Sequence, residues 1–350
     1  MGLRGRIGRR GTLAGATALL GVSLVMLLVA AIGAQPAAAR ASQNDGNRSQ
    51  IKNFQHVFII MMENTGFDSL IGNPNAPWIN AAAAQYGVAT NYYGVTHPSQ
   101  PNYIAATSGS TNGVTADTST NVDAPNIVDQ MEAHGKTWKA YMQSYAPCIA
   151  TPLVDSCGNQ LYERKHNPFI SYVDVQSNPA RVANIVDLSQ FSTDLAGNSV
   201  PDYSWISPDQ CHDMHGRGAP ASDPCSFSNE QQLIATGDTF LQQTVGAIMS
   251  SRAWNGNSVI FIQWDESDFT GTGPAGFGDT RGCCDSNPGG GLVLSLVISH
   301  SDHSARSSAV AYNHFSMLAT IEDGWKLGCL AFTCDTTNVP PMSDLVGPKG

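Results

Sequence analysis

The sequence predicts one α/β domain with a mostly parallel central sheet flanked by helices, and three observations lead to this prediction. Apolar runs such as 56–62 and 258–264 are typical of strands that are buried on both faces. These runs alternate with helical patterns, as in proteins built from βαβ units. The 350 residues are 42% hydrophobic and only 13% charged, which allows a large core and argues against a disordered chain.

The individual elements are expected from apolar periodicity and from the residues that begin or end each run. One helix is marked by Pro77 in its first turn and by Gly87 just after its end. This helix is expected over 77–86, and the next is expected to begin at about 101. We expect further helices over 126–134, 230–250 and 313–322. Gly237 and Gly246 are weak points of the long helix. We expect strands over 56–62, 88–93, 137–142, 203–206, 258–264 and 291–299.

The first 39 residues are expected to be an export signal. Arg9 and Arg10 precede an apolar run over about 13–32, and small residues at 37–39 suit cleavage. The arginine pair also fits a twin-arginine signal loosely. A retained membrane anchor is the alternative, because the run is nearly long enough to span a bilayer. After cleavage we expect no stable membrane span, a secreted or cell-envelope location, a flexible leader over 40–53 and a single domain over 54–350.

The charge of the chain limits its partners. The formal net charge is −10, and the basic residues Arg4, Arg6, Arg9 and Arg10 all lie in the expected export signal. An acidic surface repels nucleic acid and anionic membranes at long range, so nucleic acid is not an expected partner. An anionic substrate would need local positive charge, most simply a bound cation.

Eight cysteines in an exported chain suggest disulfides. Two pairs are close enough in sequence to form local disulfides, namely Cys148 with Cys157 and Cys329 with Cys334. A bond between the adjacent Cys283 and Cys284 would be strained. We therefore expect these two cysteines to pair with Cys211 and Cys225. There is no C-x-x-C motif, which argues against a zinc ribbon or a thioredoxin-like site.

Two of the expected buried strands end in adjacent polar residues. Glu63 and Asn64 follow the first strand, and Asp265 and Glu266 follow the strand over 258–264. Ligands of open α/β sheets bind beyond the carboxyl ends of strands, so these side chains are expected to meet there. Hard oxygen ligands without cysteine favour Ca²⁺, Mg²⁺ or Mn²⁺ over Zn²⁺. Each pair taken alone could equally be part of a solvated loop.

Ser99 is a candidate nucleophile. It lies in a loop fixed by two prolines, two residues after His97 and just before an expected helix N-terminus. A serine next to a bound cation attacks more readily than a free hydroxyl. Asn102 could then hydrogen-bond a phosphoryl oxygen. The alternative is that Ser99 only caps the helix and that Asn102 only stabilises a turn.

The densest group of titratable residues is His212, Asp213 and His215. The two histidines are three residues apart, so a single helical turn would aim both at one point. A protonated histidine beside a phosphoryl group can protonate the leaving oxygen. Metal binding is another possible role, and an ordinary surface loop is the third.

Three further residues are candidates for substrate binding. Lys165 and His166 could hold a phosphate group, or they could form an ordinary basic surface pair. His314 lies at the start of an expected helix, where it is either a site residue or a neighbour of the helix cap. None of these three assignments follows from a pattern as distinctive as the two acidic strand ends.

Seven segments in the same order resemble a known family, the bacterial phosphoesterases that include secreted acid phosphatases, notably mycobacterial ones, and phospholipases C. They extend from about 54 to 347 and so cover nearly the whole chain after the export signal. The segments are 56–64, 97–103, 164–166, 213–215, 264–268, His314 with 320–322, and 340–344.

The resemblance implies an alkaline-phosphatase-like fold and roles for particular residues. It implies metal ligation by the two strand ends, Ser99 as nucleophile and Asn102 as phosphate ligand. It also implies His215 as general acid, with Asp213, His212, His97 and His166 nearby. The chain departs from the family pattern at 65–68, at His212, at Gly216 and in the segments 217–227 and 270–290. These departures affect the expected substrate rather than the reaction class.

The resulting expectation is a secreted, metal-assisted acid phosphatase that hydrolyses phosphate monoesters through a phosphoserine. Its expected substrate is a small phosphate ester or a phosphoinositide head group. Two alternatives remain, a phospholipase C or phosphodiesterase, and a non-catalytic secreted module that binds through the same cation. The chain has neither a G-x-S-x-G elbow nor a P-loop, which argues against an α/β-hydrolase esterase and a P-loop nucleotide hydrolase.

Overall fold

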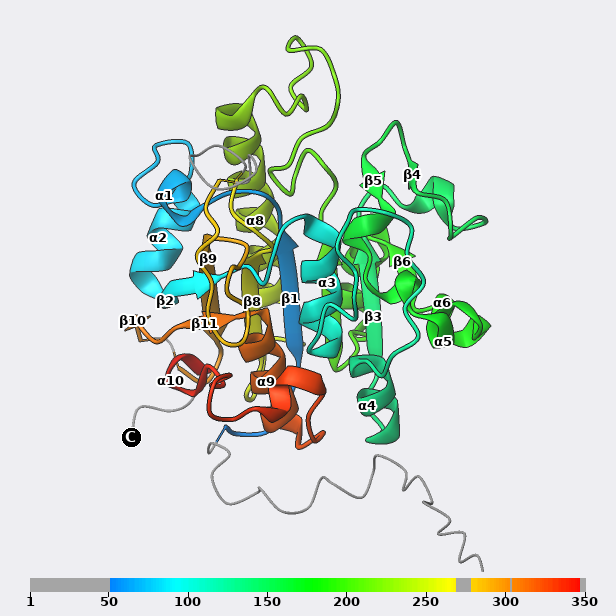
Figure 1. Cartoon of the computed structure of the whole chain (residues 1–350), viewed down its shortest axis with the longest axis vertical. Helices are drawn as coiled ribbons and strands as arrows, with labels where there is room; N and C mark the ends of the chain where they lie inside the picture. The colour runs from blue at the N-terminus through cyan, green and yellow to red at the C-terminus, as the bar shows by residue number, and fades with distance from the viewer. Residues whose placement is uncertain (1–50, 269–277, 303, 347–350) are drawn as a thin grey trace, which may run out of the picture. The chain divides into compact units, whose positions relative to one another are not determined.

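The computed structural model describes residues 51–268, 278–302 and 304–346, all of which belong to one compact unit. These residues form a nine-stranded mixed sheet in the order β10-β2-β9-β8-β1-β7-β3-β6, with β11 paired to β2 (Figure 1). β9 runs antiparallel to its neighbours β8 and β2, and the other described pairings in this sheet are parallel. The strands are β1 Val57–Met62, β2 Gly87–Tyr93, β3 Trp138–Met142, β6 Ile185–Asp187, β7 Tyr203–Ser207, β8 Val259–Trp264, β9 Leu292–Ser299, β10 Arg306–Ser308 and β11 Tyr312–Asn313.

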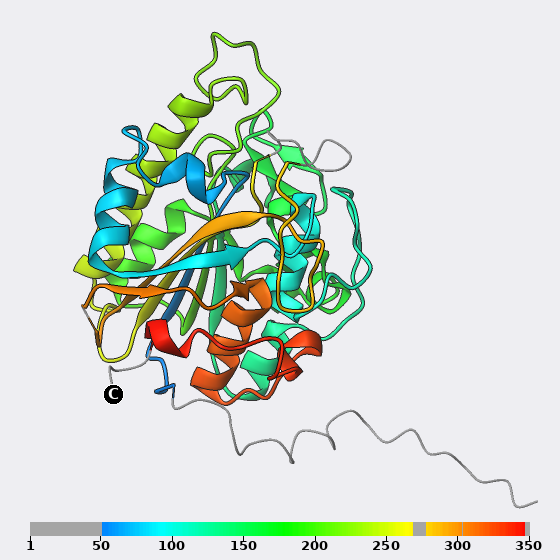
Figure 2. The same ribbon diagram turned by 60° about the vertical axis from the view of Figure 1, so that its left-hand side comes forward.

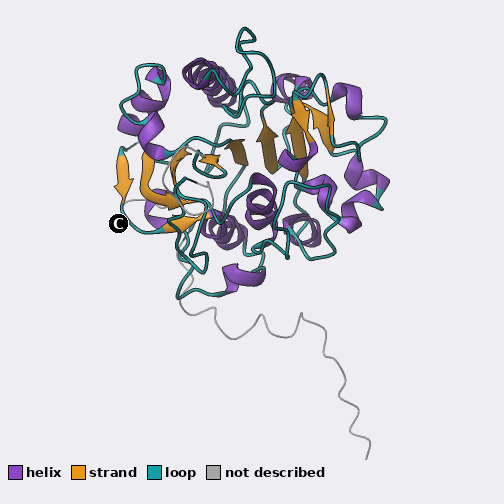
Figure 3. Ribbon diagram, turned by 45° about the horizontal axis from the view of Figure 1, so that its top comes forward, coloured by secondary structure: helices purple, strands orange, loops and turns teal. Residues whose placement is uncertain are grey.

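Helices cover both faces of this sheet (Figures 2 and 3). On one face α3 packs against α9, and on the other α2 packs against α8. A short ribbon of β4 Ser156–Cys157 and β5 Tyr162–Glu163 lies outside the main sheet. The α-helices are α1 Phe67–Leu70, α2 Pro77–Gln85, α3 Ser99–Ser108, α4 Ile127–Ala133, α5 Val173–Gln176, α6 Pro179–Val182, α7 Ser189–Gly197, α8 Glu230–Ser250, α9 His314–Trp325 and α10 Ser343–Val346.

The predicted α/β fold with a mostly parallel sheet is confirmed, and the expected elements form with bounds that differ by a few residues. β1 and β8 are buried along their whole length, because they lie inside the sheet with helices on both sides. The sequence did not reveal β6 or β10, which have three residues each and lie at the two ends of the strand order, and it did not reveal the nine-residue helix α7.

Two expectations about the chain need correction. Cys211 pairs with Cys225, and Cys283 pairs with its neighbour Cys284, so the expected cross-pairing of these four is wrong. The fold places Cys211 and Cys225 at the two ends of one loop between β7 and α8, which brings them together directly. The local pairs expected from sequence do form, Cys148–Cys157 and Cys329–Cys334.

The expected leader over 40–53 differs at its end, because Ile51 is buried in the core and Asn257 donates hydrogen bonds to the carbonyls of residues 52 and 53. The remainder of the leader and the expected export signal over 1–39 lie outside the described residues. Within the described residues, no helix has both the length and the apolar character required to cross a bilayer.

Candidate active site

Two strand ends form the first half of the site. β1 and β8 pair in parallel from Val57 with Val259 to Met62 with Trp264, so both strands end at the same level. Glu63–Asn64 and Asp265–Glu266 therefore emerge side by side at the carboxyl edge of the sheet. The backbone N–H of Asn64, which has a left-handed φ of 32°, donates to Asp265 Oδ1 at 3.1 Å. This turn joins the two strand ends directly.

Ser99 is the first residue of α3, and its side chain points to the strand ends rather than capping the helix. Its Oγ lies 3.0 Å from Glu63 Oε2, 3.1 Å from Glu266 Oε1 and 3.4 Å from Asn64 Oδ1. A hydroxyl carries one hydrogen, so it can satisfy only one of these three oxygens at a time. The predicted neighbourhood of Ser99 with the two strand ends is therefore present in the structure.

The charges in this group demand a counter-charge. Glu63, Asp265 and Glu266 are fully buried. Burial raises the pKa of all three carboxyls, and repulsion from another of the three acids raises the pKa of Glu63 and Asp265 further. Glu63 Oε1 and Asp265 Oδ2 are buried without a hydrogen-bond partner. Several buried oxygens therefore compete for the single hydrogen of one hydroxyl. Such a group of oxygens is the set of ligands that a divalent cation requires.

Two predicted site residues support the strand ends instead of facing an open site. His97 Nδ1 contacts Glu266 Oε2, and its Nε2 lies 2.9 Å from the carbonyl of Asp279. His314 Nε2 donates to the carbonyl of Asp265 at 2.6 Å, and its Nδ1 lies 3.0 Å from the hydroxyl of Tyr92. In each ring, both nitrogens therefore contact other groups of the protein. We correct the substrate-binding role expected for His314 accordingly.

The pKa values of these two histidines differ because their partners differ. Burial alone would lower the pKa of His97, but the hydrogen bond with Glu266 and the charge of that carboxylate raise it. Burial lowers the pKa of His314 to about 4, and its backbone partner opposes this only in part. His314 is thus a neutral imidazole, whereas His97 gains from carrying a charge beside Glu266.

Asn102 also has a different role from the one expected. Its Oδ1 accepts hydrogen bonds from the backbone N–H groups of Val95 and Thr96, at 2.8 and 3.1 Å. Its Nδ2 donates to the carbonyls of Thr96 and Pro98, at 2.7 and 3.1 Å. The amide thereby uses both donor hydrogens on the loop before Ser99. Asn102 holds the loop before Ser99 in place and has no hydrogen left for a phosphoryl oxygen.

The second half of the site comes from a short 3₁₀ helix and from the loop that carries Asp213 and His215. His166, at the end of the 3₁₀ helix η3 Arg164–His166, directs Nε2 to within 3.0 Å of Glu63 Oε1. Its Nδ1 lies 3.5 Å from Asp213 Oδ2. A carboxylate behind a histidine, with the other ring nitrogen aimed into a site, is the usual arrangement around metal-binding histidines. The backbone N–H of Glu63 donates to the carbonyl of Asp213 at 2.8 Å, which ties the two halves together.

His215 completes this group. Its Nδ1 donates to the carbonyl of Gly216 at 2.7 Å, so Nε2 keeps its lone pair. Burial and, second to it, the charge of the neighbouring Lys165 lower the pKa of His215 to about 4. Glu63, His166 and His215 each offer one ligand atom, and these atoms lie within 4.8 Å of one another. This buried Glu/His group and the adjoining strand ends together suggest that a metal ion binds in this region.

Lys165 reaches the same group, and a residue missed at the sequence level holds it there. Its Nζ donates to Asp117 Oδ2 at 2.8 Å and lies 3.5 Å from His215 Nε2. Asp117 Oδ1 also accepts from the backbone N–H of Gln100, the residue after Ser99, at 2.8 Å. No motif marks Asp117, because its partners come from distant parts of the chain. The one signal in the sequence that could have suggested Asp117 is its acidic side chain, which can pair with the basic residues Lys165 and His166.

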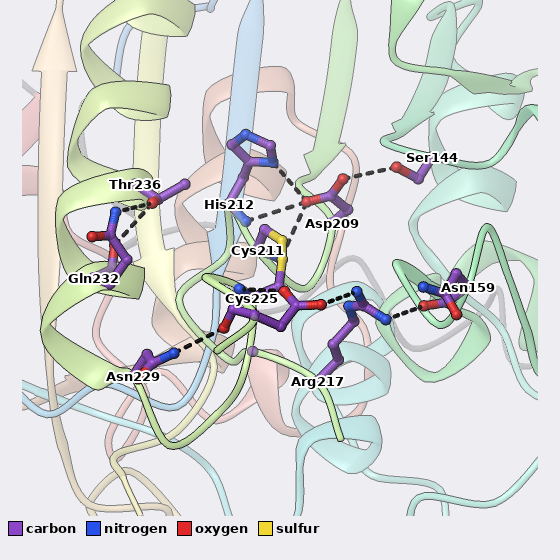
Figure 4. Close-up of a disulfide and its surroundings, with 12 residues drawn as sticks. Ser144, Asn159, Asp209, Cys211, His212, Arg217, Cys225, Asn229, Gln232 and Thr236 are labelled. Carbon is purple, nitrogen blue, oxygen red and sulfur yellow. Dashed lines mark hydrogen bonds and ion pairs between the residues drawn. A yellow bond between two sulfur atoms is a disulfide. The ribbon is translucent and has the colours of Figure 1, made fainter. Parts of the chain in front are cut away.

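His212 does not join this group, contrary to expectation. Its Nδ1 pairs with Asp209 Oδ1 at 2.6 Å, and Asp209 Oδ2 accepts from the hydroxyl of Ser144 at 2.7 Å (Figure 4). The ring packs near Phe240 and lines a separate polar pocket along α8. The expected single helical turn is absent, because Met214 between the two histidines has a φ of 81°. His212 and His215 therefore face different surroundings.

The loop that carries Asp213 and His215 is held from two sides. The Cys211–Cys225 disulfide closes its outer part, where Arg217 donates to Asp223 Oδ2 at 2.6 Å and to the carbonyl of Asn159 at 3.1 Å (Figure 4). Met214 packs directly over Gly237 of α8, where a Cβ atom would lie 2.5 Å from Met214 Cε. The glycine that weakens the helix thus makes room for the turn between Asp213 and His215.

The model of the phosphoesterase family matches residues 73–328. The chain belongs to the phosphoesterase family. This confirms the family expected from the seven ordered segments and, with it, the enzyme class, a phosphoric ester hydrolase.

Two relatives of this phosphoesterase illustrate the match. A phosphatidylinositol-3-phosphatase of Mycobacterium tuberculosis is 28% identical over 338 residues, which cover 95% of this chain and 94% of the relative. A probable acid phosphatase of Kluyveromyces lactis is 27% identical over 281 residues, or 78% of this chain. The aligned part spans only 59% of that yeast relative.

Solved structures support the fold of this phosphoesterase. A protein of the alkaline phosphatase superfamily from Vibrio parahaemolyticus has a TM-score of 0.51 and 12% identity, covering 84% of this chain and 74% of its own. The phosphonate monoester hydrolase of Agrobacterium radiobacter has a TM-score of 0.53 and 13% identity, covering 84% of this chain and 78% of its own. At these identities the likeness concerns the fold, and it agrees with the alkaline-phosphatase-like architecture expected.

Proposed function

We propose that this protein is a metal-assisted phosphatase of the acid phosphatase type, which hydrolyses phosphate monoesters through a phosphoserine at Ser99. The observation that supports this most directly is the position of Ser99 Oγ, within 3.4 Å of Glu63, Asn64 and Glu266 at the joined strand ends. The hydroxyl is held by a rigid helix and a loop that Asn102 pins. This is the pre-organised geometry that a nucleophile requires.

The first chemical step transfers the phosphoryl group to Ser99. The bond from Ser99 Oγ to phosphorus forms while the bond from phosphorus to the leaving oxygen breaks. The serine proton passes to a carboxylate that already accepts it, Glu63 Oε2 or Glu266 Oε1. The leaving oxygen takes a proton from Nε2 of His215, which carries one only at acidic pH because the pKa of this histidine is lowered to about 4. Water then attacks the phosphoserine, the same groups reverse their roles, and phosphate leaves.

The oxygen-rich half of the site would hold the cation. Glu63, Asn64, Asp265 and Glu266 are its proposed ligands, and their donor set favours Ca²⁺, Mg²⁺ or Mn²⁺. A cation bound there would stabilise negative charge on the serine oxygen and on the phosphoryl group. His97 and His314 keep Glu266 and Asp265 in place from behind. Lys165 is the proposed contact to a phosphoryl oxygen, because its ammonium is the basic group that reaches this site.

The natural substrate and location are finer proposals. The mycobacterial relative supports a phosphoinositide head group as a candidate substrate, since it aligns over 94% of its length with this chain. Four disulfides among the described residues support an oxidising compartment and hence an exported protein.

A substrate panel with matched variants tests the proposed function. We expect wild-type protein to hydrolyse an aryl phosphate monoester faster than the corresponding diester, with activity lost in excess EDTA and restored by Mg²⁺, Ca²⁺ or Mn²⁺. Ser99→Ala should lower kcat about 10³-fold or more, because no nucleophile remains. Ser192→Ala, at an exposed position of α7, is the control. Preferential diester hydrolysis would support a phosphodiesterase, and no turnover of any ester would support a binding module.

A further inference from the structure

Next to the oxygen-rich cluster, Glu63, His166 and His215 form a triangle that could hold a second cation. Their ligand atoms lie within 4.8 Å of one another. Glu63 Oε1 and His166 Nε2 are both buried and lie 3.0 Å apart as an ion pair, and neither makes a hydrogen bond to another group. His215 Nε2 keeps its lone pair because Nδ1 donates to Gly216. One carboxylate and two imidazoles suit a transition metal such as Zn²⁺ or Co²⁺.

A lysine already reaches this triangle. Lys165 Nζ lies 3.5 Å from His215 Nε2, so the ammonium faces the lone pair that a metal would use. The position of the lysine is fixed from behind, because Asp117 Oδ2 accepts from Nζ at 2.8 Å. Asp117 is itself anchored, since its Oδ1 accepts from the backbone N–H of Gln100 at 2.8 Å. The side chain of Lys165 is only 18% exposed, which leaves it little room to move away.

We propose that Lys165 takes the place of a second divalent cation: its ammonium excludes metal from the triangle of Glu63, His166 and His215 and supplies the positive charge there. Two of the three N–H donors of Lys165 face Asp117 and His215, and the third remains for a phosphoryl oxygen. A metal bound to His215 Nε2 would lie within a few ångströms of the ammonium, and the two positive charges would repel each other in this buried setting. The inference rests on the proposed function, which places one cation at the oxygen-rich cluster.

Co²⁺ is a suitable probe, because its visible absorption distinguishes nitrogen-containing, low-coordinate sites from oxygen-rich ones. Equilibrium dialysis of the purified full chain should give about one bound equivalent for wild type and about two for Lys165→Met. The additional equivalent should bring new visible absorption. It should disappear in the double variant Lys165→Met/His215→Ala, because an imidazole ligand is then missing.

Two matched variants separate the charge of Lys165 from general disturbance. Lys165→Arg keeps a positive charge and should stay at about one equivalent, as should Lys139→Met, which removes a lysine paired with Asp194 away from the site. Thermal unfolding of each variant checks that it is folded. A wild-type protein that binds two equivalents, one of them lost in His215→Ala, would overturn the inference. So would a folded Lys165→Met variant that stays at one.

The same experiment distinguishes this inference from the proposed function. If wild type binds no Co²⁺ and EDTA leaves its activity unchanged, the metal-assisted mechanism fails. The inference about Lys165 is then judged by the Lys165→Met variant alone. A single equivalent that appears in this variant and depends on His215 supports the exclusion of metal by the lysine, and no gain refutes it.

Discussion

The two halves of the candidate site are built in different ways. Glu63–Asn64 and Asp265–Glu266 follow two neighbouring strands whose register fixes them at one level. Lys165, His166 and the segment 213–215 come instead from a 3₁₀ helix and a long loop. The strand-end half is held by the sheet itself, whereas the loop half is held by individual contacts such as those of Asp117, Gly216 and Gly237.

This difference shows where the site is rigid and where it can be adjusted. Strand ends inside a sheet cannot move without breaking ladder hydrogen bonds, so they suit a cation that needs fixed ligands. Loop residues can change position or identity at lower cost, so they suit the recognition of different phosphate esters. A change in the strand-end half should therefore abolish activity, and a change in the loop half should alter it by degrees.

The largest effect is expected from Asp265→Asn, which removes one charge of the strand-end half but keeps the oxygen that Asn64 contacts. We expect kcat/KM to fall by about 10³-fold, because several kcal/mol of charge stabilisation by the cation depend on this ligand. The metal-free variant should be as stable as wild type or more stable, since one of three mutually repelling buried acids is neutralised.

Steady-state kinetics and thermal unfolding in EDTA check this pair of outcomes. Asp123→Asn, at an exposed position, is the matched control and should change neither quantity. A variant of Asp265 that keeps more than a tenth of wild-type activity would show that the strand ends do not hold the cation.

The loop half is tested by comparing two histidines that lie three residues apart. His215→Asn should lower kcat/KM by about 10²-fold, because a group placed to transfer a proton is lost. His212→Asn should lower it by less than about threefold, because that ring pairs with Asp209 in a separate pocket. Equal losses in the two variants would contradict the separation that the structure shows.

The strand-end half of the site could be predicted from the sequence better than the loop half. The pattern of buried runs ending in acids predicts Glu63, Asn64, Asp265 and Glu266, because apolar strands of one sheet share an edge. Ser99 was also placed correctly among them, since prolines and an expected helix start fixed its loop. These signals are local in the chain, and the sheet brings them together.

The remaining roles depend on contacts that no local pattern contains. The spacing of His212 and His215 suggested one face of a helical turn, but the left-handed backbone of Met214 turns the rings apart. Asn102 satisfies its own loop, and Asp117 acts through partners from other elements. The disulfide between Cys211 and Cys225 likewise depends on the path of a loop, and this path could not be predicted from the sequence.

A smaller effect should come from the packing beneath the loop half. Gly237→Ala places a Cβ 2.5 Å from Met214 Cε and 2.6 Å from Met214 Cγ, so Met214 must shift together with its neighbours Asp213 and His215. We expect a loss of about 1–3 kcal/mol in stability, as for overpacked sites, and a fall in kcat/KM of about tenfold. Denaturant unfolding and steady-state kinetics measure both.

Gly246→Ala in the same helix is the matched control for this substitution. An added Cβ meets nothing within 4 Å there, and the exposed position gains helix propensity. The control should therefore gain about 0.5–1 kcal/mol in stability without a change in activity. If both alanines stabilise the protein and leave kcat/KM unchanged, the packing of Met214 on α8 does not position the loop.

The smallest effect concerns the pH dependence of stability at Asp209, behind His212. Burial alone would raise the pKa of Asp209, but hydrogen bonds from His212 and Ser144 and the electrostatic effect of His212 lower it below its usual value. A carboxyl with a lowered pKa in the folded state stabilises the protein above its unfolded pKa of about 3.9, and this contribution is lost as the pH falls through the folded value.

Asp209→Asn should therefore cost about 1 kcal/mol, or roughly 2 °C in Tm, at neutral pH. The gap in Tm between wild type and variant should narrow as the pH falls below about 4, and it should close once the pH is below the lowered pKa of Asp209 in the folded state, where the wild-type carboxyl is neutral as well. A gap that widens on acidification would mean that the charge of Asp209 does not stabilise this side of the loop, and that its hold rests on the disulfide and on Met214 instead.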